Sequence, residues 1–306
     1  MTALPVVDTH HHFWRLDEQQ QHWRTPQHGA IAADYLPADL EGELRRSGVD
    51  ATVLVEAVDT AAENDRLREH ARAVPFVAGL VGWLPLPDPR EARQELARSR
   101  SPDLRGVRCL VGRDPLDRLE QPEAISLFRA LADEGLAWDV VVVTAAQTHS
   151  VARIARAVPS LRVVVDHLAR PPLDTAGWQP WADHIRRLSD CPNVALKLSI
   201  GVDVLTAWRA WAAAELAPYV ALAVECFGPS RLMLASNWPV VLLRQTYERA
   251  WGDLVESVKL AGVAGAELGE VLGGTAMRWY DLPRPATPGG GECRPGTPRG
   301  RARTHA

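Results

Sequence analysis

Short runs of Val, Leu, Ile and Ala recur along the chain and alternate with longer amphipathic segments. Each run has the length of one strand and is bounded by polar or turn-forming residues. Several runs are apolar at nearly every position, which is typical of parallel strands that are buried on both faces. The predicted strands are residues 6–12, 52–57, 76–84, 104–110, 137–143, 161–167, 194–199 and 231–238.

The segments between these runs have the spacing of helices, as in Leu40 and Leu44, which lie four positions apart. Strand and helix alternate eight times, which favours a single (β/α)8 barrel of the α/β class. The alternative is an open doubly wound sheet, but no GxGxxG turn follows the first strand. The predicted helices are residues 37–47, 61–73, 90–99, 121–134, 149–157, 178–188, 206–227, 244–260 and 264–272.

Length and composition agree with one large domain followed by a tail. The chain has 306 residues, 46% of them hydrophobic, and α/β barrels of this length are often single domains. Residues 283–306 are rich in Pro, Gly and Arg, so they lack the apolar side chains that would offset the entropy of ordering. We therefore expect a barrel over residues 1–282 and a disordered tail over 283–306, solvated rather than bound to nucleic acid.

The overall charge limits the partners that we expect. A formal net charge of −4 and a pI of about 6.2 give no electrostatic reason for binding nucleic acid or an anionic membrane. No segment has the length and apolarity of a transmembrane helix, and the N-terminus lacks a secretory signal pattern. The four cysteines form no CxxC pair, which is typical of free thiols in the cytoplasm. The expected partner is a small-molecule substrate; the sequence leaves the oligomeric state open.

The most informative polar residues lie in the first predicted strand. Asp8, His10 and His12 are spaced by two, which places them on one face of a strand. Two imidazoles near a strand end can bind a divalent metal, transfer protons or hold a polar substrate. A solvated histidine run is the alternative. The apolar residues before the histidines and Phe13 and Trp14 after them favour a buried segment instead.

Other polar residues fall at the ends of the remaining strands, which meet at one mouth in a barrel. A lone charge inside an apolar strand costs several kcal/mol unless it is paired, so a shared polar pocket is expected. The candidates for this pocket, besides His10 and His12, are Glu56, Arg108, His167, Lys197 and Asn237. Glu56, Arg108 and Lys197 are predicted to bind substrate, with structural ion pairs as the alternative. Specificity is expected in the loops after the strands, including residues 14–31 and 58–64.

Tryptophan is unusually frequent, with eleven residues in the chain. Trp14, Trp23, Trp83, Trp138 and Trp238 fall near predicted strand ends, where indole rings could line a substrate pocket. Packing in the core is the alternative for each of them.

These segments together resemble the lactonase branch of the amidohydrolase superfamily, over about residues 5–281. The HxH of the first strand is moderately specific alone, and the Asp-His-x-x-x-Pro and Ser-x-Trp-Pro-Val patterns make the resemblance strong. The resemblance implies a distorted (β/α)8 barrel that hydrolyses a lactone ring, with zinc in some relatives and no metal in others. The matching pieces are residues 7–14, 106–108, 165–171, 197–199 and 227–240.

By this resemblance, His10 and His12 match the HxH, and His167 matches the histidine of the sixth strand. Asn237 falls where many relatives carry an aspartate, the presumed general base. An ionised carboxylate can take a proton from water, whereas an amide cannot. This departure puts the family's usual mechanism in question.

The number of candidate metal ligands leaves open whether the chain binds a metal ion. A catalytic zinc needs about three protein ligands and a water, and His10, His12 and His167 could supply three nitrogens. A binuclear centre is not expected, because its usual carboxylate is missing and no lysine stands where a carbamate bridge would form. We expect one divalent metal, zinc being the candidate, or none, and no organic cofactor.

The leading hypothesis is a hydrolase that opens the lactone of a sugar acid or a related small acid. His10 and His12 would stabilise the oxyanion, His167, with an ordinary pKa near 6.5, would take the proton of water, and Asn237 would orient the reacting groups. The second hypothesis is the same barrel with a changed reaction, a decarboxylase or cyclase, because of Asn237. The third is a non-catalytic protein that binds a small molecule.

Overall fold

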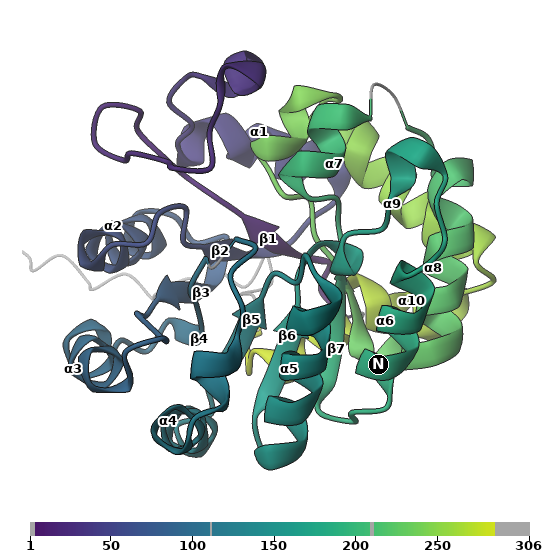
Figure 1. Cartoon of the computed structure of the whole chain (residues 1–306). Helices are drawn as coiled ribbons and strands as arrows, with labels where there is room; N and C mark the ends of the chain where they lie inside the picture. The colour runs from purple at the N-terminus through teal and green to yellow at the C-terminus, as the bar shows by residue number, and fades with distance from the viewer. Residues whose placement is uncertain (1–3, 111, 209–210, 285–306) are drawn as a thin grey trace, which may run out of the picture.

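A computed structural model describes residues 4–110, 112–208 and 211–284. Eight parallel strands form one sheet in which the spatial order is the sequence order (Figure 1). The fold prediction is therefore confirmed. The strands are β1 (Val7–His11), β2 (Ala51–Val55), β3 (Val77–Trp83), β4 (Leu104–Arg108), β5 (Ala137–Val140), β6 (Arg162–Val165), β7 (Val194–Leu198) and β8 (Leu232–Leu234).

The sheet closes into a nearly complete barrel between β1 and the residues that follow β8. His11 and Trp238 form a parallel bridge. The backbone N–H of Asn237 donates to the carbonyl of His10 at 2.8 Å, and that of His12 donates to the carbonyl of Trp238 at 2.7 Å. This closure brings the two ends of the barrel sequence together, and it places Asn237 beside the histidines of β1.

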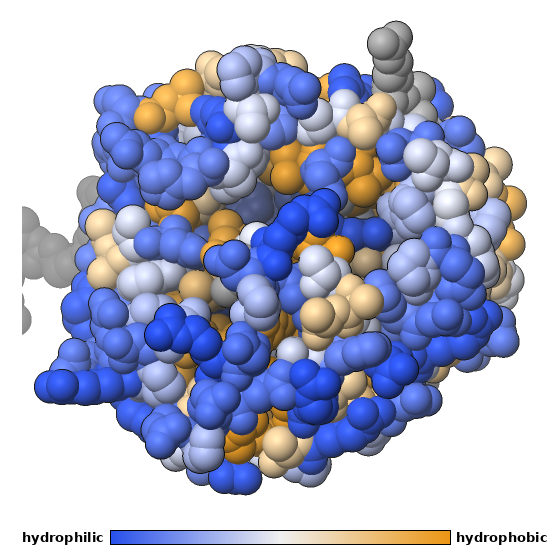
Figure 2. Space-filling view, in the orientation of Figure 1, coloured by the Kyte–Doolittle hydropathy of each residue, from blue (hydrophilic) through white to orange (hydrophobic). Residues whose placement is uncertain are grey.

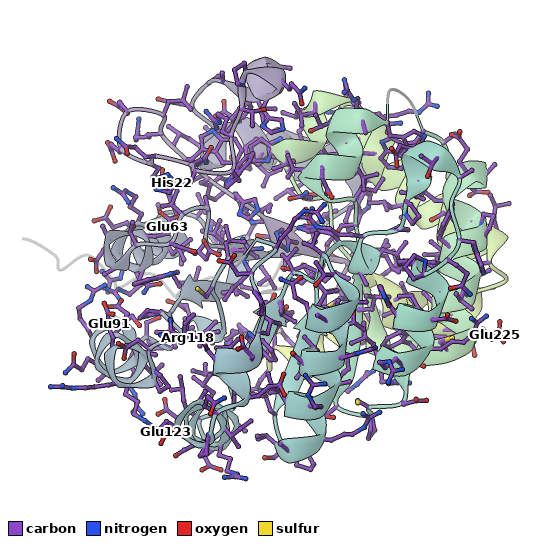
Figure 3. All side chains as sticks on the ribbon, in the orientation of Figure 1. His22, Glu63, Glu91, Arg118, Glu123 and Glu225 are labelled. Carbon is purple, nitrogen blue, oxygen red and sulfur yellow. The ribbon has the colours of Figure 1, made fainter. Side chains whose placement is uncertain are left out.

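The helices surround the strands on the outside (Figure 1). Their outer faces are polar, and labelled charges such as Glu91, Glu123 and Glu225 lie toward the periphery (Figure 3). The helices are α1 (Pro37–Ser47), α2 (Ala61–Ala73), α3 (Pro89–Ser99), α4 (Pro122–Asp133), α5 (Ala145–Ala157), α6 (Trp181–Ser189), α7 (Val202–Ala207), α8 (Ala213–Phe227), α9 (Tyr247–Leu260), α10 (Gly265–Gly269) and α11 (Thr275–Trp279), with a π-helical turn at Glu270–Gly274 between the last two.

The single helix predicted over residues 206–227 is wrong, because the structure has two helices there. Trp208 and Trp211 stack on each other with ring centroids 6.1 Å apart, and both are buried. Ala212 is extended, and its N–H donates to the Glu215 carboxylate at 2.9 Å, which caps the start of α8. Burial of the two indoles therefore interrupts a pattern that is otherwise helical.

The far end of the barrel interior is filled by apolar side chains and closed by the last described segment. Tyr280 and Leu282 follow α11 and pack with Val53, Val81 and Met233 of the strands. This packing leaves the other end of the barrel for polar residues. The tail predicted over residues 283–306 lies, from residue 285 on, outside the described residues. Within the described part, no helix has both the length and the apolar character needed to cross a membrane.

Candidate active site

A cavity of about 140 Å³ opens at the C-terminal ends of the strands. A shaded hollow near the middle of the molecular face in Figure 2 lies between polar and apolar side chains. Four of the predicted site residues reach its wall: His12, Arg108, His167 and Asn237. The full wall consists of His12, Trp23, Ala57, Arg108, Leu110, Gly112, Val141, Val143, His167, Arg170, Val202, Asn237 and Val240.

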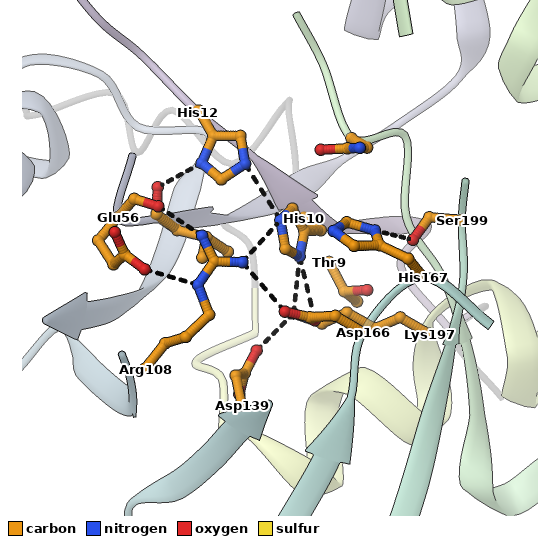
Figure 4. A network of polar contacts seen from close by, with 12 residues as sticks. Thr9, His10, His12, Glu56, Arg108, Asp139, Asp166, His167, Lys197 and Ser199 are labelled. Carbon is orange, nitrogen blue, oxygen red and sulfur yellow. Dashed lines mark hydrogen bonds and ion pairs between the residues drawn. The ribbon is translucent and has the colours of Figure 1, made fainter. Parts of the chain in front are cut away.

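The three predicted histidines converge at the base of this cavity, with His12 and His167 in its wall. His10 lies in the centre and is fully buried. Its ring centroid is 4.8 Å from that of His12 and 4.7 Å from that of His167. The Nε2 atoms of His10 and His12 are 3.1 Å apart (Figure 4). The strand spacing of β1 and the end of β6 thus produce one imidazole cluster.

Hydrogen bonds and burial define the protonation of this cluster. His12 Nδ1 lies 2.9 Å from the Val55 carbonyl, which can only accept, so Nδ1 carries the proton and Nε2 is an acceptor. His167 Nδ1 lies 2.9 Å from the Ser199 hydroxyl. Burial lowers the pKa of His167 to about 3, and those of His10 and His12 well below the ordinary value. All three are neutral at neutral pH, so the expected pKa near 6.5 for His167 is corrected downward.

Beneath the histidines, Lys197 joins three acceptors inside the barrel. Its Nζ atom lies 2.5 Å from Asp139 Oδ2, 3.1 Å from Asp166 Oδ1 and 3.3 Å from His10 Nδ1. All four side chains are fully buried. The three N–H groups of the ammonium therefore match three acceptors, and Lys197 anchors His10 from below (Figure 4).

Arg108 is the second buried cation. Its Nε donates to Glu56 Oε1 at 2.6 Å, its Nη2 to the Glu56 carbonyl at 2.6 Å, and its Nη1 to Asp166 Oδ2 at 3.0 Å. Nη1 also lies 3.3 Å from His10 Nε2. The guanidinium is only 2% exposed, yet it contributes to the cavity wall. It therefore brings a fixed positive charge to the base of the cavity.

The network is short of one positive charge. Three carboxylates, Glu56, Asp139 and Asp166, meet two cations, Lys197 and Arg108. Burial raises the pKa of Glu56 to about 8 and raises that of Asp139. Burial opposes ionisation of Asp166 as well, but the charges of Lys197 and Arg108 hold its pKa well below the usual range. Asp166 is thus the permanent anion, and Glu56 and Asp139 can hold the balancing proton.

Two residues predicted to bind substrate lie elsewhere. Lys197 and Glu56 are 0% exposed and do not belong to the cavity wall. Each is fully buried and is held by its ion pair. The sequence analysis gave structural ion pairs as the alternative to substrate binding, and the observed contacts of Lys197 and Glu56 are of that kind.

Four of the five candidate tryptophans, Trp14, Trp83, Trp138 and Trp238, also lie outside the cavity wall. Trp14 is buried, packs edge-on against Trp23, and donates its indole N–H to the Ala33 carbonyl at 2.9 Å. Trp238 is buried in aromatic packing, and half-buried Trp83 ends β3. It is Trp23, from the predicted specificity loop over residues 14–31, that reaches the cavity. Indole rings near strand ends serve mainly as packing here.

Asp8 departs from the common face predicted for β1. Its Oδ2 accepts from the Tyr247 hydroxyl at 3.1 Å, and its Oδ1 accepts from the Ser236 N–H at 2.8 Å. The pairing of β1 with β2 is irregular between Asp8 and His11. This irregularity breaks the period of two, so Asp8 supports the backbone at the barrel closure while His10 and His12 face the site.

A left-handed turn after β6 brings a further residue to the cavity. His167, Leu168, Ala169 and Arg170 have φ values of 55°, 51°, 51° and 56°. Each non-glycine residue in this region carries strain of roughly 1–2 kcal/mol, and such strain concentrates at functional sites. The turn places both His167 and Arg170 in the wall. No glycine marks it in the sequence, so the place of Arg170 in the wall was missed.

Asp139 was also missed as a site residue, and Asp166 was noted only as a polar residue at the end of the sixth strand, without a role. Each is a lone carboxylate in or directly after an apolar strand, the same signal that drew attention to Lys197. A buried lysine needs a buried anion, and this rule could have found both.

Asn237 is fixed by its backbone and its side chain. It has a φ of 57° and is 2% exposed. Its Nδ2 donates to the Ile200 carbonyl at 2.8 Å. Because that carbonyl only accepts, the amide nitrogen faces Ile200, and Oδ1 is the acceptor that Asn237 offers elsewhere.

A possible metal site exists, but two protein cations lie beside it. His10, Asp166 and His167 offer ligand atoms within 4.8 Å of one another, with Asp166 in the place predicted for His12. These donors are consistent with an optional divalent metal. However, Lys197 and Arg108 already contact Asp166 and His10 through the same atoms. Their charges repel a cation at this distance, so this arrangement does not fit a resident metal.

The family follows from comparison of the whole barrel. A model of the family described as Amidohydrolase matches residues 7–282. The chain belongs to the amidohydrolase family. The match begins at β1 and ends at the segment that closes the barrel.

Similar proteins fit this assignment. An L-fucono-1,5-lactonase of Burkholderia ambifaria is 31% identical, over 92% of this chain and 97% of that protein. An L-fucono-1,5-lactonase of Burkholderia multivorans is also 31% identical, with the same coverage. A crystal structure of an amidohydrolase from Burkholderia multivorans with bound zinc superposes with a TM-score of 0.81 at 30% identity, over 91% of this chain and all of that one.

Proposed function

We propose that this amidohydrolase hydrolyses a lactone, the cyclic ester of a small hydroxy acid. The observation that carries the proposal is the convergence of His12, His167, Asn237 and a charged Arg108 on one small cavity at the barrel mouth. Relatives that are 31% identical are L-fucono-1,5-lactonases. The site offers a proton acceptor, a fixed positive charge and an orienting amide, which are the groups that ester hydrolysis needs.

In this mechanism the lactone carbonyl oxygen points to Arg108 at the base of the cavity, beside His12. Water attacks the carbonyl carbon, and its proton passes to Nε2 of the neutral His167, whose Nδ1 is oriented by Ser199. The positive charge of Arg108 stabilises the oxyanion, an effect typically worth a few kcal/mol. The carbon–oxygen bond of the ring then breaks, and the ring oxygen takes the proton from His167. Oδ1 of Asn237 orients the water.

The first test is a lactone panel, with ring opening followed by proton release. We expect turnover of at least one lactone, retained after treatment with a chelator, because no proposed step uses a metal. Activity that disappears with the chelator and returns with zinc would contradict the metal-free mechanism. Failure to open any lactone would contradict the proposed function and favour a changed reaction.

The second test concerns the histidines. His167→Ala should lower kcat about a hundredfold or more, the usual effect of losing an acid–base group. His12→Ala should also lower kcat, because it removes the acceptor beside His10 Nε2 at the base of the cavity. His149→Ala is the matched control, because His149 is exposed on α5. Circular dichroism should show that all three variants keep the fold. If the His167 and His149 variants were equally active, His167 would have a structural role only.

The cellular setting belongs to the same proposal. Cys109, Cys191 and Cys226 are free thiols in the described structure, which agrees with a reducing cytoplasm. A small-molecule substrate is the expected partner.

A further inference from the structure

Two loops of the cavity wall are joined by one buried side chain behind them. Leu110 and Gly112, from the loop after β4, and Val143, from the loop after β5, line the cavity. Gln147 lies in the first turn of α5 and is fully buried. It does not belong to the wall, yet its amide is hydrogen-bonded to both loops. The shape of this side of the cavity therefore depends on a residue outside it.

The amide of Gln147 uses all of its hydrogen-bonding capacity in this link. Nε2 donates to the carbonyls of Gly112 at 3.0 Å and of Asp114 at 2.8 Å. Oε1 accepts from the N–H groups of Val143 at 2.7 Å and of Thr144 at 3.2 Å. Carbonyls only accept and N–H groups only donate, so no other orientation of the amide satisfies these four partners. Because the amide is planar and rigid, it holds the two loops at a fixed separation.

The link is built on a rigid support. The backbone N–H of Gln147 donates to the Thr144 hydroxyl at 3.2 Å, and this bond completes the capping box that begins α5. The helix itself packs against the core of the barrel. The loop after β4 has a second tie, because Asp59 Oδ1 accepts from the Leu110 N–H at 3.2 Å. With Leu110 held from the other side, Gln147 fixes where Gly112 stands in the wall.

The reacting groups stand on other parts of the barrel. Arg108 ends β4, His167 follows β6 and Asn237 follows β8. Among the described residues, the hydrogen bonds of these three side chains go to groups other than Gln147. A change at Gln147 should therefore alter what fits in the cavity while the reacting groups keep their own partners.

We propose that Gln147 is a positioning residue that determines specificity: it sets the width of the cavity between Gly112 and Val143, and so limits the size of the group that the lactone ring can carry. The inference rests on the proposed lactone hydrolysis and goes beyond it. The cavity volume, about 140 Å³, is close to that of a cavity which holds one benzene ring, roughly 150 Å³. A ring with a longer side chain fits only if the two loops move apart.

Two variants of Gln147 release the loop after β4. In Gln147→Glu the carboxylate still accepts from Val143 and Thr144, but it loses both donors and repels the two carbonyls that they held. Gln147→Met loses the same donors without adding a charge. Gln94→Glu is the matched control, because Gln94 is exposed on α3. Hydrogen exchange should become faster in the loop after β4 in both Gln147 variants and stay unchanged in the control. Unchanged exchange in that loop would overturn the inference.

A pair of lactones tests the effect on specificity. δ-Hexalactone and δ-octalactone carry a methyl and a propyl group on the same ring carbon. The wild type should prefer δ-hexalactone by tenfold or more in kcat/KM, since pockets discriminate single methylene groups on this scale. Both Gln147 variants should lower this ratio about tenfold, mainly through KM, whereas Gln94→Glu should keep it. An equal loss on both lactones would mean that Gln147 serves stability only, which would overturn the inference and leave lactone hydrolysis standing.

Binding of lactams, which resist hydrolysis, separates this inference from the proposed function. Calorimetry would compare 6-methyl- and 6-propylpiperidin-2-one, the lactam counterparts of the two lactones, in the wild type and in Gln147→Glu. A preference for the methyl compound that weakens about tenfold in the variant supports the inference even if neither lactone is opened, in which case only the proposed reaction fails. Equal selectivity in the two proteins, or binding of neither lactam, overturns it.

Discussion

At the scale of single residues, the position of Asn237 determines what the site can use as a base. Its amide nitrogen is committed to the Ile200 carbonyl, and its backbone N–H to His10. An amide does not accept a proton from water, so proton transfer falls to His167. Burial keeps the pKa of His167 near 3. Its neutral, proton-accepting form is therefore present at every pH above about 4.

This placement predicts different pH profiles for the wild type and Asn237→Asp. The wild type should show no acid limb in kcat/KM between pH 5 and 8, because its histidines are already neutral there. In the variant, a carboxylate oxygen replaces the nitrogen beside the Ile200 carbonyl, and burial and repulsion raise the pKa of the new carboxyl group. Activity should then rise with pH inside that window as the group ionises.

The measurement is kcat/KM for one turned-over lactone across pH 4–9 in both proteins. A variant profile identical to that of the wild type would mean that residue 237 lies away from the reacting atoms. A wild-type limb near pH 6.5 would mean that a histidine with an ordinary pKa controls the reaction.

At the scale of elements, the loop after β6 carries two residues of the cavity wall on strained backbone. His167 to Arg170 form the left-handed turn, and Ala176 farther along the loop has a φ of 51°. Sequence patterns predicted the strand but not this turn, because none of these positions is glycine. The strain holds two side chains toward the cavity that a regular strand end would direct elsewhere.

The strain in this loop can be measured at Ala176, which is exposed. Ala176→Gly should stabilise the protein by about 1 kcal/mol, because glycine adopts positive φ without the steric penalty. Ala97→Gly is the matched control, since Ala97 is exposed on α3 and should lose about 1 kcal/mol. The free energy of unfolding, measured in urea, should rise in Ala176→Gly and fall in Ala97→Gly. Destabilisation of both variants to the same extent would argue against strain at Ala176.

The ends of the strands show why sequence patterns located the barrel better than its site. The run predicted over 137–143 ends as β5 at Val140, and the run over 231–238 ends as β8 at Leu234. Val141 and Val143 continue the apolar pattern because they line the cavity. An apolar binding wall therefore looks like a longer strand in the sequence. Burial of Lys197 and Glu56 depends on partners that lie on other strands, which spacing alone does not reveal.

At the scale of the whole molecule, the buried ion network joins the strands across the barrel interior. Lys197 of β7 connects Asp139 of β5 with Asp166 after β6 and His10 of β1. Lys197→Met should cost about 3–5 kcal/mol of stability, because it leaves buried Asp139 without its cation and Asp166 with Arg108 alone. Lys259→Met is the natural control, since Lys259 is the other lysine of the chain and half-exposed. Its change should stay within about 0.5 kcal/mol, measured by denaturant unfolding.

Unchanged stability of Lys197→Met would also be informative. Replacement of a buried ion pair by apolar groups is sometimes neutral, but Lys197→Met changes only one partner. Equal stability of the two lysine variants would mean that the network takes up a proton in place of the ammonium, which the raised pKa of Asp139 favours.

The end of the described chain connects the closed side of the barrel to the site. Tyr280 is fully buried, and its hydroxyl donates to Asp139 Oδ2 at 2.7 Å. Asp139 in turn holds Lys197, which contacts His10. The segment after α11 thus fills the barrel interior from below and supports the histidine cluster through two polar contacts.

Two shortened chains test this connection. A chain that ends at Arg284 should unfold at the wild-type denaturant concentration, because the sequence predicts that the residues beyond it are disordered. A chain that ends at Trp279 removes Tyr280 and Leu282 from the core. It should lose at least about 3–5 kcal/mol, the range for deleting one large buried side chain, and its kcat should fall as Asp139 loses its hydrogen bond. Tyr280→Phe separates the two effects, since it keeps the packing and removes only the hydroxyl. If the chain ending at Trp279 were as stable as the one ending at Arg284, the barrel interior would be closed without this segment, and the proposed link from Tyr280 to the site would be wrong.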